Sequence, residues 1–354
     1  MIRLSNRLPR LLLAAGLFAG VLLSPASAQI ANPAAADLFD GQALRVVLCG
    51  TSGPLPDPAR AKSCTLIIAG EAAYVVDTGP ESWEQIARMA IPGVRIAGIF
   101  LTHYHSDHIG ELGEFRMQTM VAGRSVRLPV YGPPGVEEVV DGFNQAYRFD
   151  KEHRLAHHGA QIINAGAADL VARPFGADLE WQGSGEVVVL EDAGLKVTAF
   201  EVDHDPVKPA VGYRFEWRGR SVVVTGDAAK SDNLVENARN ADVLVGDSLA
   251  ASIILQAQRA AQAGGNSRQA KLLTDIPDYH ASPVELAEMA NGANVGLLVY
   301  SHFVPPLQAT TPLYFAGVQA VRPQDKWVAG YDGLRIDLPA SSTDIRQSGL
   351  LPKP

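Results

Sequence analysis

Apolar runs alternate with polar stretches rich in glycine and proline along most of the chain, and they predict strands in two batches. The first batch of expected strands covers 44–48, 64–69, 73–76, 94–101 and 129–133. The second batch covers 186–190, 195–202, 210–217, 221–225, 243–245 and 297–300. Helical patterns occupy 83–89, 111–121, 135–149, 232–238, 248–263 and 282–290. Each batch of strands is followed by helices, which indicates two sheets packed face to face with helices outside.

Two further stretches complete this pattern. Residues 150–185 show no regular periodicity, and we expect an irregular segment there. Near the end, 327–329 and 334–336 are expected to form a last hairpin around the turn at 331–333. No linker divides the chain, so we expect one domain at 44–340. A flexible segment, 29–43, would precede it and a tail, 341–354, would follow it.

The first 28 residues have the composition of an export leader. An apolar run, 11–23, follows three arginines and ends before Ala26-Ser27-Ala28. Its 13 residues are too few to span a bilayer comfortably, and the small residues match a cleavage site. We expect 1–28 to be a cleaved signal peptide, with no stable membrane span afterwards and a periplasmic or secreted protein. An uncleaved membrane anchor is the alternative.

Charge and cysteine content narrow the choice of partners. Removal of Arg3, Arg7 and Arg10 with the leader lowers the formal net charge from −8 to −11. Such a surface repels polyanions unless a local basic patch overrides it, so long nucleic acid is an unexpected partner.

The two cysteines, Cys49 and Cys64, lack the spacing of a zinc site. They could form a disulfide in an exported protein or remain two buried thiols.

The strongest candidate for chemistry is the segment His103-Tyr104-His105-Ser106-Asp107-His108, which follows an apolar run. Neutral imidazole nitrogens and carboxylate oxygens are ligands of Zn²⁺ and similar metals. A solvated histidine-rich loop is the alternative. Three more potential ligands, His204, Asp227 and His302, also stand just after apolar strands. Alone, each is more typical of a surface residue or a turn. Their combination with the first cluster predicts a metal centre.

This ligand series resembles that of the metallo-β-lactamase superfamily. Asp77 in Val-Val-Asp-Thr-Gly resembles an early turn of the same superfamily. The nearer match is the ribonuclease Z-like branch. The stretches that are similar to this branch include Gly50-Thr51-x-x-Pro54, Tyr131-Gly132-Pro133, Val211-Gly212-Tyr213-Arg214 and His280-Ala281-Ser282. The resemblance implies an α/β fold, the αβ/βα sandwich, with the metals at one edge.

The resemblance also assigns roles to individual residues. One divalent ion would be held by His103, His105 and His204. The second would be held by Asp107, His108 and His302, and Asp227 would bridge the two. Zinc is the first expectation, and manganese or iron would also suit these ligands. A hydroxide bridging the ions would attack the substrate. His280, oriented by Asp247, would donate a proton to the leaving group, and Asp107 would be essential for turnover.

These assignments predict an exported dinuclear hydrolase that cleaves a phosphodiester, or a related ester such as an aryl sulfate, of a small molecule. Ribonuclease Z enzymes that process tRNA carry a protruding arm between the third histidine and the bridging aspartate. Here only 22 residues separate His204 from Asp227, which leaves no room for an arm. The alternatives are a tRNA 3′-processing endoribonuclease, a β-lactamase and, in another class, a non-catalytic metal-binding protein. The oligomeric state stays open, a homodimer included.

The extra segments 142–185 and 249–279 are expected to rim the cleft. The first of them holds a mixed group of polar side chains that could contact an anionic substrate or form a solvated face. This group is Tyr147, Arg148, His153, Arg154, His157 and His158.

Overall fold

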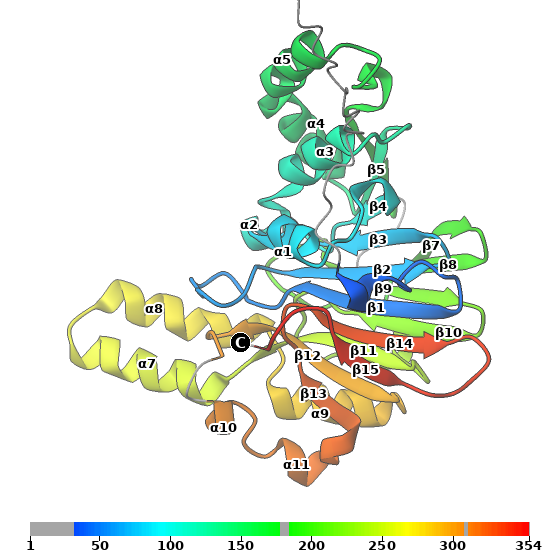
Figure 1. Ribbon diagram of the computed structural model, residues 1–354. Coiled ribbons are helices and arrows are strands. Elements are labelled where there is room, and N and C mark those ends of the chain that lie inside the picture. Colours follow the sequence, from blue (N-terminus) through cyan, green and yellow to red (C-terminus); the bar gives the residue numbers. More distant parts are fainter. Residues whose placement is uncertain (1–31, 178–183, 308–310, 354) are drawn as a thin grey trace, which may run out of the picture. The chain divides into compact units, whose positions relative to one another are not determined.

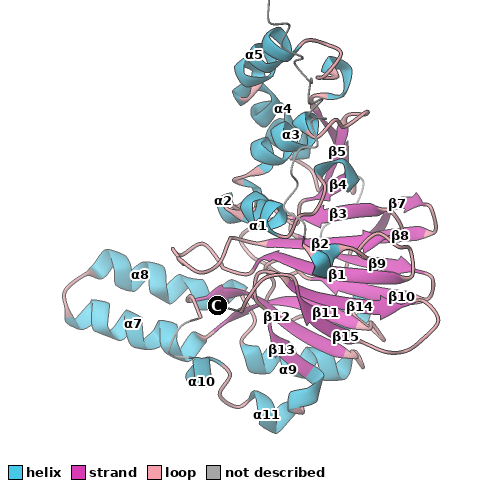
Figure 2. Ribbon diagram, viewed as in Figure 1, coloured by secondary structure: helices cyan, strands magenta, loops and turns pink. Residues whose placement is uncertain are grey.

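The computed structural model describes residues 32–177, 184–307 and 311–353. The predicted signal peptide, 1–28, lies outside the described residues. Two mixed β-sheets and helices on their outer faces make up the described fold (Figures 1 and 2). The predicted αβ/βα sandwich is therefore confirmed.

Sheet A has eight strands in the order β15-β14-β1-β2-β3-β4-β5-β6. Its strands are β1 (Ala43–Gly50), β2 (Cys64–Ala69), β3 (Ala72–Val76), β4 (Ile96–Phe100), β5 (Leu128–Gly132), β6 (Leu170–Pro174), β14 (Leu334–Pro339) and β15 (Arg346–Gly349). Strands β2 and β3 form an antiparallel hairpin. From β3 to β6 all neighbouring strands are parallel, so their carboxyl ends share one edge.

Sheet B has seven strands in the order β13-β12-β11-β10-β9-β8-β7. Its strands are β7 (Glu186–Asp192), β8 (Leu195–Glu201), β9 (Val211–Trp217), β10 (Arg220–Val224), β11 (Val243–Leu249), β12 (Leu297–Val304) and β13 (Trp327–Ala329). Strands β9 and β10 form an antiparallel hairpin. Strands β10 to β13 are parallel, which again gathers carboxyl ends at one edge.

The helices include α1 (Ser82–Arg88), α2 (Ser106–Ile109), α3 (Leu112–Val121), α4 (Val136–Ala146), α5 (Arg148–His158), α6 (Asp232–Asn237), α7 (Ala251–Ala263), α8 (Ser267–Asp275), α9 (Pro283–Gly292), α10 (Thr311–Tyr314) and α11 (Val318–Val321). Helix α9 begins with a capping box. The Ser282 side chain accepts from the backbone of Glu285, whose side chain accepts from the backbone of Ser282.

Alternation along β1 shows why this strand is buried at every position. Leu44, Val46 and Leu48 pack against sheet B, while Val47 and Cys49 pack against the helices outside sheet A. Successive side chains of a strand point to opposite faces, so a strand covered on both sides buries every position. A third cluster packs α6 and α9 against the outer face of sheet B.

The hairpin predicted from 327–329 and 334–336 is wrong. Strand β13 pairs with β12 in sheet B, whereas β14 pairs with β1 in sheet A. The turn between them crosses from one sheet to the other, and the backbone N–H of Gly333 donates to the carbonyl of Leu48. Sheet A also extends beyond residue 340, because β15 pairs with β14.

Two differences concern the segment that follows β5. The expected single helix at 135–149 is two helices, α4 and α5, and the expected irregular region contains most of α5 and all of β6. Helix α5 has no buried residue, so it lacks an apolar stripe that the sequence could reveal. Two ion pairs at a spacing of four residues, Arg148–Glu152 and Arg154–Asp150, stabilise it instead.

Within the described ranges, no helix combines the length and apolarity that a membrane crossing requires.

Cys49 and Cys64 form a disulfide at the point where β1 leaves β2. The alternative of two buried thiols therefore does not apply. The chain returns so closely here that a Cβ atom at Gly50 would lie 1.7 Å from the carbonyl oxygen of Lys62. The loop that the disulfide closes reaches β12, where Gly53 lies against the ring of His302.

We predict that replacing both cysteines by alanine lowers the free energy of unfolding by about 3 kcal/mol, since the bridge closes a short loop. The sequence separation of the bridged residues is 15. Urea unfolding of the oxidised protein and of the double variant measures the difference. Reducing agent should shift the wild-type midpoint and leave the double variant unchanged. Two titratable thiols in the purified, unreduced protein would contradict the bridge.

Candidate metal centre

Residues from both sheets meet at the shared edge of carboxyl strand ends. His103 and His105 follow β4, while Asp107 and His108 lie in α2. His204 follows β8 and Asp227 follows β10. Asp247 lies in β11, His302 lies in β12, and His280 follows the short helix Ile276–Tyr279. The structure therefore brings together every residue that the sequence nominated for metal binding or catalysis.

Three sets of these side chains have ligand atoms within 4.8 Å of one another. The sets are His103 with His105, His204 and Asp227; Asp107 with His108 and His302; and Asp227 with Asp247, His280 and His302. All of these residues are buried except His105, which is exposed and marks the open side of the site.

The carboxylate of Asp227 stands between the first two sets. One oxygen, Oδ2, lies 3.8 Å from Nε2 of His103 and 3.9 Å from Nε2 of His204. The other, Oδ1, lies 3.2 Å from Nε2 of His108 and 3.3 Å from Nε2 of His302. Ligand atoms 2.0–2.2 Å from a tetrahedral zinc ion are roughly 3.4 Å apart, so these separations suit two neighbouring ions.

Hydrogen bonds outside the centre fix the histidine rings. Nδ1 of His204 donates to the carbonyl oxygen of Tyr279 at 3.0 Å, which leaves Nε2 with a lone pair. That buried Nε2 has no hydrogen-bond partner in the described structure. Nδ1 of His108 similarly lies 2.8 Å from Oδ2 of Asp77. Oriented rings with inward lone pairs are what a metal ligand set requires, so the residues fit divalent metal ions.

The electrostatics of the site support the same conclusion. Burial lowers the pKa of His103, and it lowers the pKa of His204 to about 4, so both rings are neutral at pH 7. Burial also opposes a charge on His108, but Asp227 and Asp77 outweigh it and raise the pKa of this ring above its ordinary value. The carboxylates thus attract positive charge to the centre, and a bound divalent cation would compensate their negative charge.

His302 reaches the centre through an irregularity in its strand. Asp247 pairs with Ser301 and Ser248 pairs with Phe303, so His302 is the extra residue of a β-bulge between β11 and β12. Its φ is 46°, in the left-handed region that non-glycine residues rarely adopt. Asp77 also has a positive φ, 60°. Bulges redirect a side chain, and strain of this kind clusters at functional sites.

His280 and Asp247 form a tightly bonded pair beside the metal residues. Nδ1 of His280 lies 2.6 Å from Oδ2 of Asp247, and the other carboxylate oxygen accepts the backbone N–H of Ala228 at 3.1 Å. The ring of His280 lies 5.8 Å from the ring of His302 and stacks on it. The carboxylate therefore holds the ring in one orientation at the wall of the centre.

Sequence reasoning missed two groups that support the centre. Thr102 donates its backbone N–H and its hydroxyl to the two oxygens of Asp77, at 2.9 and 2.8 Å. Tyr279 acts through its backbone carbonyl, a group that any residue type could supply at this position. A threonine directly before the histidine cluster was a visible signal, whereas the carbonyl left none in the sequence.

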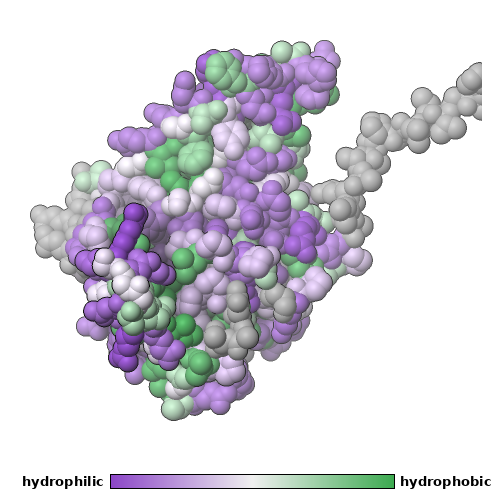
Figure 3. All heavy atoms as spheres, turned by 90° about the vertical axis from the view of Figure 1, so that its left-hand side faces the viewer, coloured by the Kyte–Doolittle hydropathy of each residue, from purple (hydrophilic) through white to green (hydrophobic). Residues whose placement is uncertain are grey.

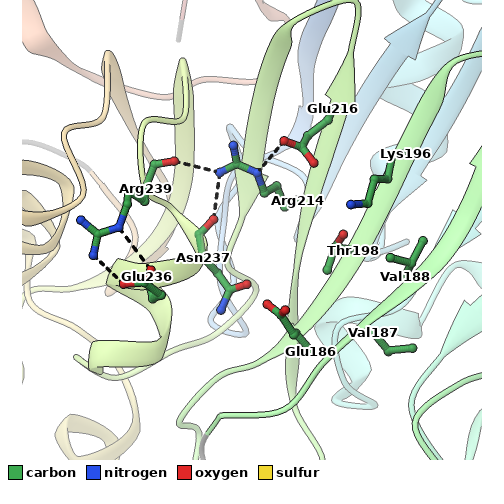
Figure 4. A pocket seen from close by; sticks show the side chains of 10 residues that line it. All are labelled: Glu186, Val187, Val188, Lys196, Thr198, Arg214, Glu216, Glu236, Asn237 and Arg239. Atoms are coloured by element: carbon green, nitrogen blue, oxygen red, sulfur yellow. Dashed lines mark hydrogen bonds and ion pairs between the residues drawn. The ribbon is translucent and has the colours of Figure 1, made fainter.

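The polar group on the segment 142–185 does not join the centre. Arg148 and Arg154 are paired with acids of their own helix, which favours the solvated face over an anion contact. A cavity of about 500 Å³ opens elsewhere, over β7–β9 and α6 (Figure 4). Its arginines are also paired, Arg214 with Glu216 and Arg239 with Glu236, and none of the clustered ligands lines it.

Comparisons with known proteins agree with this geometry. The sequence model of the Beta-lactamase superfamily domain matches residues 73–303. Ribonuclease Z of Mycobacterium bovis is 35% identical over 267 residues, which are 75% of this chain and 87% of the relative. Ribonuclease Z of Mycolicibacterium paratuberculosis is 35% identical over 269 residues, 75% of this chain and 88% of the relative.

Two solved structures share the fold at low identity. A metallo-β-lactamase fold protein from Bacillus subtilis, YhfI, has a TM-score of 0.58 at 18% identity and covers 84% of this chain and 99% of its own. The short form of human tRNase Z has a TM-score of 0.56 at 18% identity and covers 83% of this chain and 99% of its own.

These relatives correct one expectation from the sequence. A small-molecule ester was the expected partner and long nucleic acid was thought unlikely, yet the relatives are ribonucleases by name. The error arose because net charge averages over the whole surface, whereas a nucleic acid meets only part of it.

The similarity to these relatives also shows that the chain is an enzyme and not a non-catalytic metal-binding protein. The chain belongs to the metallo-β-lactamase superfamily, in its ribonuclease Z-like branch, and is a metal-dependent hydrolase of phosphodiester or related ester bonds.

Proposed function

We propose that the protein is a two-metal ribonuclease that hydrolyses a phosphodiester bond of RNA, with a tRNA precursor cut at its 3′ side as the first substrate to test. One observation carries the proposal. The two oxygens of Asp227 face two separate sets of histidines, at distances of 3.2–3.9 Å. A carboxylate placed in this way can bridge two cations. Two-metal sites serve in-line displacement at phosphorus.

The assignment of ligands follows the geometry. His103, His105 and His204 would hold one ion with Oδ2 of Asp227, and Asp107, His108 and His302 would hold the other with Oδ1. We take zinc as the resident metal, because five imidazoles and two carboxylates suit it. Divalent ions bound there supply Lewis acidity and lower the pKa of a coordinated water.

The other residues of the site orient groups and move a proton. Burial alone would raise the pKa of Asp107, but a hydrogen bond from His302 and the charge of His108 lower it to about 2, which keeps this carboxylate ionised. Asp247 holds Nδ1 of His280, so Nε2 is free to serve the leaving oxygen. His105 is the exposed member of the ligand set, so a phosphodiester would approach the site from its side.

RNA is preferred to other esters because of the relatives. Those aligned over most of their length are named ribonuclease Z, and a structural neighbour is named tRNase Z.

We further propose that the protein works outside the cytoplasm. The leader-like residues 1–28 support this, as does the disulfide, because such bridges persist in oxidising compartments. The substrate would then be RNA that reaches that compartment.

Our first prediction concerns RNA cleavage. The zinc-loaded protein should cut a tRNA precursor between its acceptor stem and its 3′ trailer, and Asp227→Ala should reduce the rate at least roughly 100-fold while lowering metal content. Gel analysis of end-labelled RNA and elemental analysis of the same samples measure both effects. Asp344→Ala is the matched control, because this exposed acid pairs only with Arg346 and with its own loop.

Hydrolysis of bis(p-nitrophenyl) phosphate without any RNA cleavage would refute the ribonuclease proposal and leave the hydrolase in place. Full RNA cleavage by Asp227→Ala would refute the bridging carboxylate.

Our second prediction concerns His280. Replacing it by alanine should retain the metal content and lower kcat by roughly 10²–10⁴-fold, with the largest loss for esters that have poor leaving groups, because a general acid helps those most. Asp247→Asn should shift the pH profile of kcat without removing metal. Metal loss in His280→Ala would instead make this residue a ligand, which its distance to Asp227 and His302 also permits.

A further inference from the structure

The segment between Asp247 and His280 differs in charge from the rest of this acidic chain. Between Asp247 and Asp275 the sequence contains no aspartate or glutamate and three basic residues, Arg259, Arg268 and Lys271; two acids, Asp275 and Asp278, follow before His280. The complete chain has a formal net charge of −8. A stretch without acids and with three bases is therefore a local exception to a surface that otherwise repels polyanions.

This segment folds into a helical hairpin, α7 and α8, that projects away from the sheets (Figure 1). Figure 3 looks onto the face from which it projects, and hydrophilic side chains cover most of that face. Along both helices most residues are exposed, and only Ile254, Ala261 and Ala270 are buried. A 13-residue helix is about 20 Å long, so the hairpin reaches well beyond the sheet edge.

The base of the hairpin is joined to the metal centre. Ala250 donates its backbone N–H to the carbonyl of Val304, and Leu249 donates to Ala281. Ile254 packs there against Leu249 and Val304, with Leu273 and Ile276 beside them. At the other end Tyr279 accepts from His204 and is followed by His280. The hairpin thus leaves from the strand of Asp247 and returns directly to His280.

Two of its charges are available to a ligand. Lys271 forms an ion pair with Asp275 on the same helix. Arg259 and Arg268 are exposed, and neither has an ion-pair partner among the residues that the structure describes. Arginine side chains without an acidic partner suit the phosphate groups of a polyanion.

From these observations we infer that the α7–α8 hairpin is an RNA-binding arm, whose Arg259 and Arg268 contact backbone phosphates while the scissile bond lies at the metals. The inference rests on the proposed ribonuclease function. It requires no base-specific contact, because phosphate contacts position a nucleic acid without reading its sequence. It also provides the local basic patch that an acidic ribonuclease needs.

The double variant Arg259→Gln/Arg268→Gln tests this arm, since glutamine removes both charges and keeps a high helix propensity. Its dissociation constant for a tRNA precursor should rise on the order of tenfold at low salt, and the slope of log Kd against log salt should fall by roughly 1.4 if both contacts reach single-stranded RNA. Its kcat for bis(p-nitrophenyl) phosphate should equal that of the wild type. Arg239→Gln/Arg346→Gln is the control, because it removes two exposed charges on other elements.

Each outcome separates the two proposals. If the wild type binds and cuts RNA while the double variant keeps the wild-type affinity and salt slope, the arm is refuted and the ribonuclease remains. If the wild type neither binds nor cuts RNA, both fail. If the control variant loses as much affinity as the double variant, the effect belongs to net charge and the arm is refuted. A change of mass in size-exclusion chromatography with unchanged RNA affinity would assign the hairpin to contacts between copies of the chain, which also refutes the arm.

Discussion

The buried carboxylate of Asp227 is the constraint on which the site depends. An ionised carboxylate removed from water is costly unless nearby positive charge compensates it. Here the neighbouring ligand residues supply imidazoles: burial holds His103 and His204 neutral, whereas the carboxylates of Asp227 and Asp77 outweigh burial and raise the pKa of His108. A centre whose carboxylates draw protons onto neighbouring rings also attracts divalent cations. The convergence of four strand ends from two sheets is what allows one carboxylate to be shared between two sets of ligands.

Strain near this carboxylate is compensated by hydrogen bonds. His302 and Asp77 both adopt positive φ angles, and such residues cost of order 1–3 kcal/mol each. Asp77 receives two hydrogen bonds from Thr102 and one from His108, so its carboxylate links the histidine cluster to the end of β3 in sheet A. The bulge at His302 depends on pairing between β11 and β12, which are central strands of sheet B. Regular structure on both sides thus maintains the two irregular residues, of which His302 is a candidate ligand and Asp77 orients the ring of His108.

Features that depend on local sequence patterns could be predicted, whereas features that depend on contacts between residues far apart in the chain could not. The ligand series was visible because each member follows an apolar strand, and the sandwich was visible from the order of strands and helices. The pairing of strands was harder to infer from the sequence. The segments 327–329 and 334–336 look like a hairpin locally, yet they pair with strands of different sheets. Helix α5 lacks a buried face, and the carbonyl of Tyr279 leaves no side-chain signal. These features depend on distant contacts or on backbone atoms.

The substrate was misjudged for a related reason, because net charge is a property of the whole chain and recognition is local. An acidic surface with one projecting basic element does not exclude a polyanion; it confines the polyanion to that element. The placement of the α7–α8 hairpin then has a mechanical consequence. Its two ends are the strand that carries Asp247 and the residue before His280, the pair held together by a 2.6 Å hydrogen bond. A polyanion bound to the hairpin, as we propose, would therefore be tied, through two short backbone connections, to the proposed proton donor, and binding and leaving-group protonation would then act from one structural unit.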